Sequence, residues 1–419
     1  EQMSGMNELE RATRAMEETR WSDAIPDLRT IHDRTPDNVD VAGKLGFALS
    51  RDERYGDAIS VFERLSAKHP KEAKWPYMVG YQYYQQKEWA QAIDWFARAL
   101  ALWPTYVKVL YRKGYAHTAI GQEPEATKAL IECITSWEKM SQDAQELDRS
   151  SYGKAQFQLG KLYLKKGLSL KARRHLQVAA QVHSEDHDVR YELGQCYLKN
   201  NQLDDALREL QAADHIKPGT DYILDRLAQT YARKGDYSAA ERVYQRIPEH
   251  RRRPFVLQHL GTMYLEQGQR EKALPYLQLA ARKQRDNHNI HYAIGQAQEA
   301  IGQLQAAHDS YALAVKFRKT KYNLEFKQAQ EALERITETL ANLPTQKTPD
   351  PTKDNEGVIE SYNESRGFGF INNKSHERLF FHVSSFAGKQ KPARGSRVTF
   401  TSESSPKGLR AVHVELAEK

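Results

Sequence analysis

A spacing of 34 residues between small side chains constrains the fold of this chain more than any other feature. Gly46, Gly80 and Gly114 are each 34 residues apart. The series continues after a longer gap at Gly160, Gly194, Ala228, Gly261 and Gly295. A second series lies twelve residues later: Ala58, Ala92, Ala126, Ala172, Ala206, Ala240, Ala273 and Ala307. A repeat of this length indicates one supersecondary unit that stacks on its own copies.

The fixed offset between the glycine and the alanine predicts a helical hairpin. Small residues let two helices cross closely, whereas larger ones would push the axes beyond the usual separation of about 8–10 Å. Apolar residues at helical spacing fill the other contacts of one unit: Leu45, Leu49, Phe62 and Leu65. Proline lacks a backbone N–H and suits a turn. Four prolines stand between units: Pro36, Pro70, Pro104 and Pro218.

These residues resemble the tetratricopeptide family, whose pattern has Gly, Tyr, Ala, Phe and Pro at set positions. Two units match it: Gly80, Tyr83, Ala92, Phe96 and Pro104, then Gly194, Tyr197, Ala206, Leu210 and Pro218. The resemblance implies a right-handed α-solenoid of about nine helical hairpins over about residues 5–320. A polar-faced closing helix at about 321–342 is expected to cover the last hairpin.

The repeat period has one large break, with 46 residues between Gly114 and Gly160. The extra residues fall near 138–152 and form either a lengthened helix or a loop. They are either a tolerated irregularity or a kink in a superhelix that covers residues 1–343. A segment rich in Pro, Thr and charge follows at 344–356, which predicts a flexible linker.

The first helix of each pair is expected to line the concave wall of the superhelix. At that wall the third and fourth units place aromatic and basic side chains that the core does not require: Tyr77, Tyr81, Tyr84, Tyr111, Arg112 and Tyr115. Lys74 and Lys108 lie nearby in the sequence. Three interpretations stay open: packing between repeats, binding of a protein partner as an extended peptide, and direct contact with nucleic acid.

The apolar period changes from 3.6 to 2 in residues 357–419. Five short alternating segments there predict a small barrel. They read GVIESYN, RGFGFI, RLFFHV, SRVTF and LRAVHVEL. This region has ten lysines and arginines against six acidic residues, so it carries +4 of the formal net charge of +7.

The segments GVIESYNESRGFGFINN and ERLFFHVSSF resemble the cold-shock domain, a family with the OB fold and two aromatic strand motifs. The resemblance implies single-stranded RNA or DNA as a partner, with RNA favoured. Strand alternation independently puts Phe368, Phe370, Phe380 and His382 on one face, where unpaired bases can stack. The candidate nucleic-acid-binding residues are Tyr362, Arg366, Phe368, Phe370, Phe380, His382, Lys407 and Arg410.

The chain departs from the cold-shock pattern at two places. Where the family usually has a Lys-Trp-Phe run, this sequence has Glu360, Ser361 and Tyr362. Val383 stands where the family usually has an aromatic residue. The losses of one cation and of stacking rings predict weaker binding by an isolated barrel.

We therefore expect a non-enzymatic adaptor that joins single-stranded nucleic acid to a protein partner. Common phosphate-loop, nucleophile-elbow and zinc-protease motifs are absent from the sequence, and neither cysteine has metal-ligand spacing, so no cofactor or metal is expected. The lack of a disulfide framework favours the cytoplasm. Two alternatives remain: a protein-interaction scaffold whose barrel binds no nucleic acid, and an accessory region of a larger bacterial surface-polysaccharide enzyme.

Overall fold

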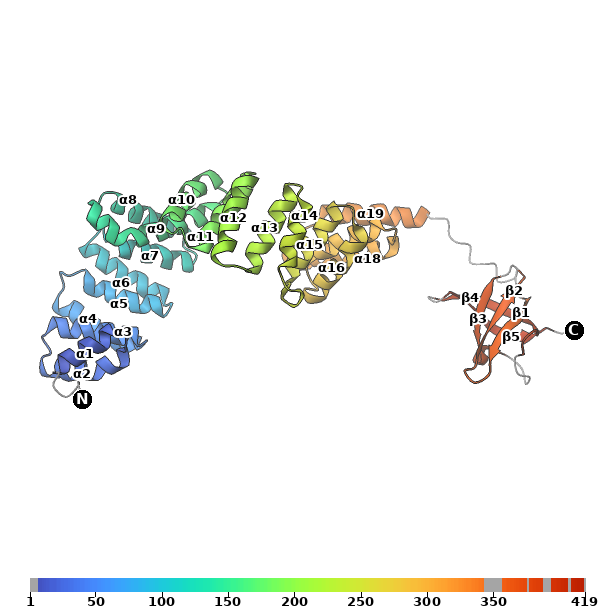
Figure 1. The fold of residues 1–419 in the computed structure, drawn as a ribbon, viewed down its shortest axis with the longest axis horizontal. Coiled ribbons are helices and arrows are strands. Elements are labelled where there is room, and N and C mark those ends of the chain that lie inside the picture. Colours follow the sequence, from blue (N-terminus) through green and yellow to red (C-terminus); the bar gives the residue numbers. More distant parts are fainter. Residues whose placement is uncertain (1–6, 343–355, 375–376, 387–392, 406–407, 418–419) are drawn as a thin grey trace. The chain divides into compact units, whose positions relative to one another are not determined.

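The computed structural model describes residues 7–342, 356–374, 377–386, 393–405 and 408–417 (Figure 1). Its contacts group the chain into two compact units, up to Ala297 and from Gln298 onward. The predicted linker at 344–356 lies outside the described residues except for Glu356. The division into superhelix, linker and barrel therefore stays a prediction.

Within the described residues, α1 to α18 form nine consecutive helical pairs, as the repeat predicts. The first four pairs are α1 Glu8–Glu17 with α2 Trp21–Arg34, α3 Val39–Arg51 with α4 Tyr55–Lys68, α5 Lys74–Gln85 with α6 Trp89–Leu102, and α7 Val107–Ala119 with α8 Glu123–Glu138. The others are α9 Gln142–Lys165 with α10 Ser169–Val182, α11 His187–Lys199 with α12 Leu203–Ile216, α13 Asp221–Arg233 with α14 Tyr237–Gln245, α15 Pro254–Glu266 with α16 Arg270–Lys283, and α17 His288–Ala300 with α18 Leu304–Tyr322.

Close contact at the small residues explains the repeat period. A Cβ added at Gly46 would lie 2.6 Å from the ring of Phe62, and one at Gly80 would lie 2.8 Å from the ring of Phe96. The same conflict would arise with a leucine of the second helix in later units, as at Gly194. All eight alanines of the second series are fully buried. The helices of each pair therefore cross where side chains larger than these do not fit.

The extra residues near 138–152 lengthen a helix and do not form a loop. They belong mainly to α9, which has 24 residues. The ring of Tyr152 stacks on Trp137 of α8 at a centroid distance of 3.8 Å. The Trp137 indole N–H also donates to the backbone oxygen of Gln145 at 2.8 Å. A kink at this place stays a prediction.

The closing helix is shorter than the sequence suggests. Residues 321 and 322 extend α18, which ends where Asn323 adopts a left-handed conformation with φ of 51°. The closing helix α19 covers Lys327–Asn342 and buries Ala329, Ala332 and Ile336 on one face. Asparagine tolerates positive φ better than most residues, so Asn323 is a physical stop between the two helices.

The C-terminal region forms the predicted closed barrel of five strands with the order β1, β2, β3, β5, β4 (Figure 1). The strands are β1 Glu356–Asn363, β2 Phe368–Asn373, β3 Arg378–His382, β4 Arg397–Ser405 and β5 Gly408–Leu416. Its core includes Ile359, Ile371, Phe381, Val398 and Val414. No helix in the described part of the chain has both the length and the apolar character needed to cross a membrane.

We expect Gly46→Ala to lower the midpoint of thermal unfolding, and Gly56→Ala to leave it unchanged or raise it slightly. Both glycines lie in helices of the same repeat, but a Cβ at Gly56 meets nothing within 4 Å. Overpacking against Phe62 should cost about 1–3 kcal/mol, while alanine gains up to about 1 kcal/mol of helix propensity at either site. Circular dichroism at increasing temperature measures the difference. Equal midpoints for the two variants would contradict the close-crossing explanation.

Candidate functional site

Three phenylalanines and a histidine share one face of strands β2 and β3. Phe368 is paired with His382 and Phe370 with Phe380 across the two antiparallel strands. The alternate residues of β3, Leu379 and Phe381, are buried in the barrel core. The rings of Phe368 and Phe380 lie 5.8 Å apart, and those of Phe370 and Phe380 lie 5.9 Å apart. We call these four residues the aromatic face; each retains some solvent exposure.

Two glycines beside the aromatic face leave room for neighbouring groups that a larger side chain would displace. A Cβ at Gly369 would lie 2.6 Å from the ring of the buried Phe381. Gly367 has φ of +67°, and its N–H donates to the backbone oxygen of Asn363 at 2.9 Å. Without a side chain at these positions, Phe381 fills the core while Phe368 and Phe370 remain on the outside.

The imidazole of His382 is oriented by the turn that follows β3. The backbone N–H of Ser384 donates to Nδ1 of His382 at 3.2 Å. A nitrogen that accepts this bond carries no proton, so in the neutral ring the proton lies on Nε2. His382 therefore offers an N–H donor beside Phe368, which suits a base edge or a phosphate oxygen.

The predicted cations have different surroundings. Arg366 is exposed in the turn between β1 and β2, where its backbone N–H donates to Asn363 Oδ1 at 3.0 Å. Arg410 is exposed on β5 and aligned with Phe380, but its guanidinium donates to Glu403 at 2.6 Å. Lys407 lies outside the described residues. The backbone thus brings Arg410 beside the aromatic face.

Tyr362 does not share the aromatic face. It is paired with Gly369, whose side of the strand faces the core. The Tyr362 ring stacks on Phe381 at 6.0 Å with an angle of 14° between the planes. Because Gly369 leaves space on the inside, the ring packs against the core. We therefore leave Tyr362 out of the proposed interface.

One cation of this surface was missed by sequence reasoning. Cζ of Arg378 lies 4.1 Å from the ring centroid of Phe370. The strand alternation that places Phe380 and His382 outside also places Arg378 there, two residues earlier. The sequence therefore contained the signal, in the alternation of β3.

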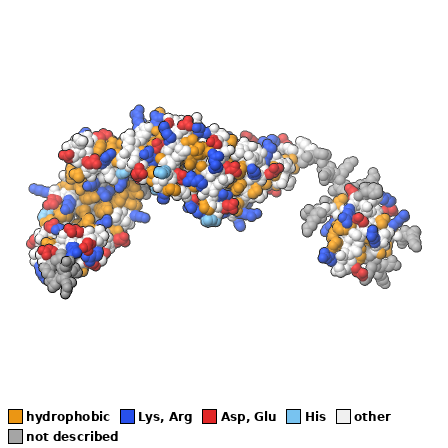
Figure 2. Space-filling model, in the orientation of Figure 1, with side chains coloured by type: hydrophobic (Ala, Val, Ile, Leu, Met, Phe, Trp, Pro, Cys, Tyr) orange, Lys and Arg blue, Asp and Glu red, His pale blue; other side chains and the backbone are white. Residues whose placement is uncertain are grey.

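The tyrosines predicted on the repeat wall form a connected cluster between α5 and α7. Ring centroids lie 5.7 Å apart for Tyr84 and Tyr115, and 6.4 Å apart for Tyr111 and Tyr115. Cζ of Arg112 lies 4.8 Å from the ring centroid of Tyr81. Figure 2 shows hydrophobic side chains gathered over α5 to α7. We call Tyr77, Tyr81, Tyr84, Tyr111 and Tyr115 the tyrosine cluster; all five are half-buried, as is Arg112.

The cluster includes residues that the sequence did not single out. The ring of Tyr106 lies 5.3 Å from that of Tyr77, and the ring of Trp89 lies 5.9 Å from that of Tyr115. Asp148 of the lengthened helix α9 is buried and lies 3.3 Å from the ammonium group of Lys108. This acidic group comes from the extra residues, which the repeat pattern could not align with any other unit.

Burial raises the pKa of three tyrosines of the cluster. It raises the pKa of Tyr77 to about 12, and the nearby Arg112 opposes this rise. Burial likewise raises the pKa of Tyr111 to about 12, and it raises the pKa of Tyr84. The tyrosines therefore present neutral rings with hydroxyl groups, next to a permanent cation.

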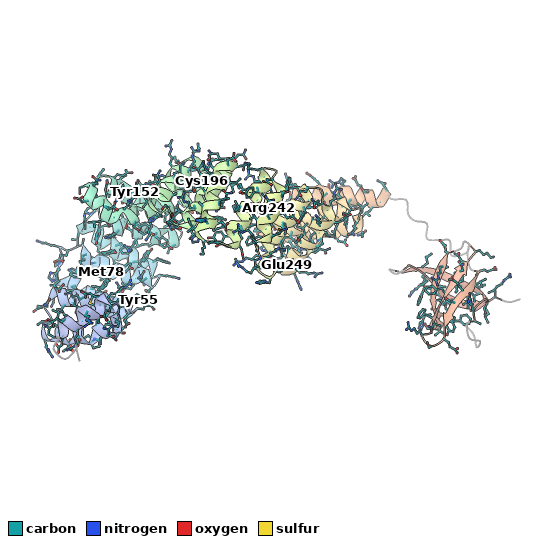
Figure 3. The ribbon with its side chains drawn as sticks, viewed as in Figure 1. Tyr55, Met78, Tyr152, Cys196, Arg242 and Glu249 are labelled. Carbon is teal, nitrogen blue, oxygen red and sulfur yellow. The ribbon has the colours of Figure 1, made fainter. Side chains whose placement is uncertain are left out.

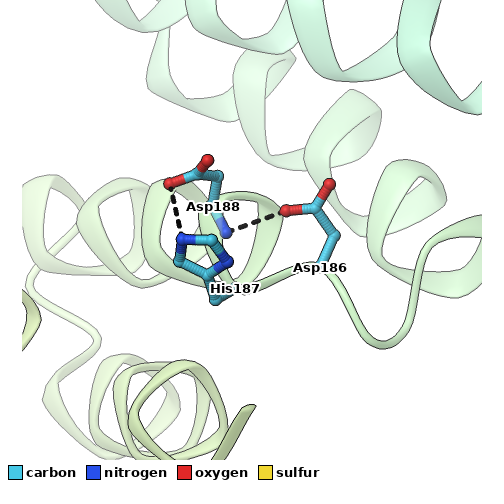
Figure 4. A group of neighbouring side chains, drawn as sticks. All are labelled: Asp186, His187 and Asp188. Atoms are coloured by element: carbon cyan, nitrogen blue, oxygen red, sulfur yellow. Dashed lines mark hydrogen bonds and ion pairs between the residues drawn. The ribbon is translucent and has the colours of Figure 1, made fainter. Parts of the chain in front are cut away.

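Two other groups in the described part of the chain have the composition of a metal or reactive site, but their surroundings argue against both roles. Asp186, His187 and Asp188 lie together at the start of α11, but Asp186 accepts the Asp188 backbone N–H at 2.9 Å as a helix cap (Figure 4). Lys217 lies 3.3 Å from His187, and a cation there disfavours a metal ion. Cys133 and Cys196 are buried free thiols, the latter labelled in Figure 3. Burial raises the pKa of both, so the thiolate form is disfavoured.

These observations define a helical-repeat binding protein that carries an OB-fold barrel. Tetratricopeptide-repeat models match residues 44–107 and 260–323, 163–225, and 223–254. The model of the 'cold-shock' DNA-binding domain matches residues 355–417. The chain therefore belongs to the tetratricopeptide-repeat proteins and has a cold-shock domain at its C-terminal end. Both families are non-catalytic binding domains, known for protein and nucleic-acid interactions respectively.

Several solved repeat proteins are similar in fold. YrrB, described as a tetratricopeptide protein with an unusual peptide-binding site, is 19% identical with a TM-score of 0.39, over 44% of this chain and 89% of its own. A repeat protein from Parabacteroides merdae is 15% identical with a TM-score of 0.47, over 66% and 98%. The human IFIT1 dimer with m7Gppp-AAAA is 17% identical with a TM-score of 0.42, over 79% and 81%. No curated protein matches the chain.

The raised pKa values predict that the repeat array loses stability between about pH 10 and 12. An unfolded tyrosine has a pKa of about 10, so unfolding releases protons in this range and is favoured as pH rises through the folded value. The double variant Tyr77→Phe and Tyr111→Phe should show a smaller fall in unfolding midpoint over this range. Parallel curves for the variant and the wild type would contradict burial of these hydroxyl groups.

Proposed function

We propose that this protein is an adaptor, which binds single-stranded nucleic acid through the barrel and a protein partner through the repeats. The observation that carries the proposal is the aromatic face on β2 and β3. Exposed rings on a sheet surface are unfavourable in water, and the side chain of Phe380 remains 39% exposed. Unpaired bases stack on such rings with about 1–3 kcal/mol per base. No step in this function requires catalysis.

RNA is the nucleic acid that we favour. In single-stranded RNA loops and ends the bases are splayed out and can stack on aromatic side chains and on histidine. The Nε2–H of the exposed His382 and the exposed Arg366 can meet phosphate oxygens while bases stack on Phe368 and Phe380. Because every base has a π face, such an interface tolerates many sequences.

The repeat side is proposed to hold a protein partner at the tyrosine cluster. Rings with polar hydroxyl groups and an arginine are enriched where proteins bind one another. Mutual packing accounts for part of the burial, but half-exposed rings leave surface for an extended peptide. Arg112, whose guanidinium lies over the rings of Tyr77 and Tyr81, favours an acidic peptide. The two cysteines, being free, support a cytoplasmic location as part of the proposal.

A pure protein-interaction scaffold is the second candidate. Its support is Ser361, which is paired with Phe370 at the position where a stacking ring is missing. A barrel that has lost nucleic-acid binding would keep its fold and use the same face for protein. An accessory role in a larger bacterial surface-polysaccharide enzyme has no such geometric support.

The nucleic-acid proposal is tested by fluorescence anisotropy of labelled single-stranded RNA, with DNA of the same sequence as comparison. We expect the full chain to bind with an affinity that falls as salt rises. The double variant Phe368→Ala and Phe380→Ala should weaken binding at least roughly 10-fold, since two stacking contacts are lost.

The matched control is Phe47→Ala, which removes a phenylalanine of similar exposure, 41%, from α3. It should bind RNA as the wild type does. Unchanged binding by the double variant would exclude the aromatic face as the interface. Absence of binding by the wild type at low salt would favour the scaffold.

If the tyrosine cluster binds the protein partner, Arg112→Glu should release that partner. The substitution reverses the charge beside Tyr81 and removes the guanidinium from its ring, so an acidic peptide should be repelled. Partners captured by the wild-type chain, identified by mass spectrometry, should be depleted at least several-fold. Arg98→Glu on α6, where the arginine lies over Trp95 at 4.2 Å, is the control. Equal loss with both variants would point to general charge effects.

A further inference from the structure

Among the described residues, Arg378 is the one cation whose charged group lies over a ring of the aromatic face. Its Cζ lies 4.1 Å from the centroid of Phe370. Its Nε donates to Glu360 at 2.7 Å, so a carboxylate of β1, on the other side of β2, holds the guanidinium over the ring. The side chain is still 57% exposed. One surface of the guanidinium is therefore supported by Phe370, and much of the group remains open to a ligand.

Beside Phe370, the layer of rings on the barrel surface is interrupted at Ser361. Ser361 is paired with Phe370 across β1 and β2, so the two side chains face the same way. A serine is too small to continue the layer of rings that Phe368, Phe370 and Phe380 form. Arg378 comes from the opposite neighbour of β2 and covers Phe370, which extends the layer by a planar group.

We propose that Arg378 is a base-contacting residue, whose guanidinium supplies the stacking surface that Ser361 does not. This inference rests on the proposed binding of single strands and adds a recognition residue to it. A guanidinium is planar and delocalised, and it stacks on aromatic faces more readily than an ammonium group does. Bases in single-stranded RNA stack on arginine planes as well as on aromatic rings. The guanidinium of Arg378 would then lie between the ring of Phe370 and the bound base.

The carboxylate of Glu360 favours a base over a phosphate as the ligand of Arg378. It lies within hydrogen-bonding distance of the guanidinium and offsets its charge. A phosphate that approached Arg378 would also approach this carboxylate, which repels it. A neutral base suffers no such repulsion. Phosphate contact is thus better suited to Arg366, which forms no ion pair with any residue that the structure describes.

The test compares the full wild-type chain with Arg378→Ala, Arg378→Lys and the reference variant Phe368→Ala. The probe is a labelled oligouridine RNA of about twelve nucleotides, within the site sizes of OB folds. Arg378→Ala should weaken binding about five-fold or more, which corresponds to one stacking contact. Arg378→Lys keeps the charge but not the plane, so it should lose nearly as much. Because Arg378→Lys also keeps a cation beside Glu360, it should leave the slope of log affinity against log salt unchanged.

Four results would overturn the inference. Wild-type affinity in Arg378→Lys together with a loss in Arg378→Ala would identify a contact that depends on charge, as with a phosphate. Tighter binding by Arg378→Ala would mean that the arginine obstructs Phe370. No effect of either substitution, with a loss in Phe368→Ala, would leave the proposed function intact and remove Arg378 from it. If even the wild type fails to bind, the proposed function fails together with this inference.

Discussion

The close crossing of two helices at a glycine and an alanine is the constraint on which the repeat array depends. At Gly46, Gly80 and Gly194 a single methyl group would collide with a buried side chain of the partner helix. The partner is a large ring or a leucine, so each hairpin pairs a small residue with a bulky one. This complementarity recurs along the array, and neighbouring hairpins then share hydrophobic clusters that extend over several units. The surface left on the first helices is free to vary, which is where the tyrosine cluster lies.

The repeat fold was predictable because its determinants are local and periodic. The glycine and alanine series gave eight of the nine hairpins and the position of the crossing in each of these. The irregular part could not be predicted in the same way. The extra residues before Gly160 matched no other unit, and the pattern allowed both a helix and a loop. The stacking of Tyr152 on Trp137 stabilises the helical alternative. That contact joins α8 and α9 and cannot be read from the period.

In the barrel, too, part of the candidate site could be predicted from the sequence and part could not. Strand alternation predicted that Phe368, Phe370, Phe380 and His382 share a face, and the register of β2 and β3 confirms it. It did not predict the side that Tyr362 takes, because a register shift between Ile359 and Ser361 changes the alternation of β1. A shift of one residue moves a side chain to the other face of a strand. Tyr362 therefore packs on Phe381, and Ser361 lies beside Phe370.

The same register shift accounts for the charge of the candidate interface. It leaves Glu360 at the edge of the aromatic face, where the family pattern usually has a basic residue nearby. An unpaired carboxylate there would repel a polyanion, and its ion pair with Arg378 offsets that charge. Arg410 is offset in the same way by Glu403, at the opposite side of Phe380. The flanks of the aromatic face are thus nearly neutral, so stacking contributes more to its affinity than charge does, and binding should depend less steeply on salt than for a strongly basic barrel.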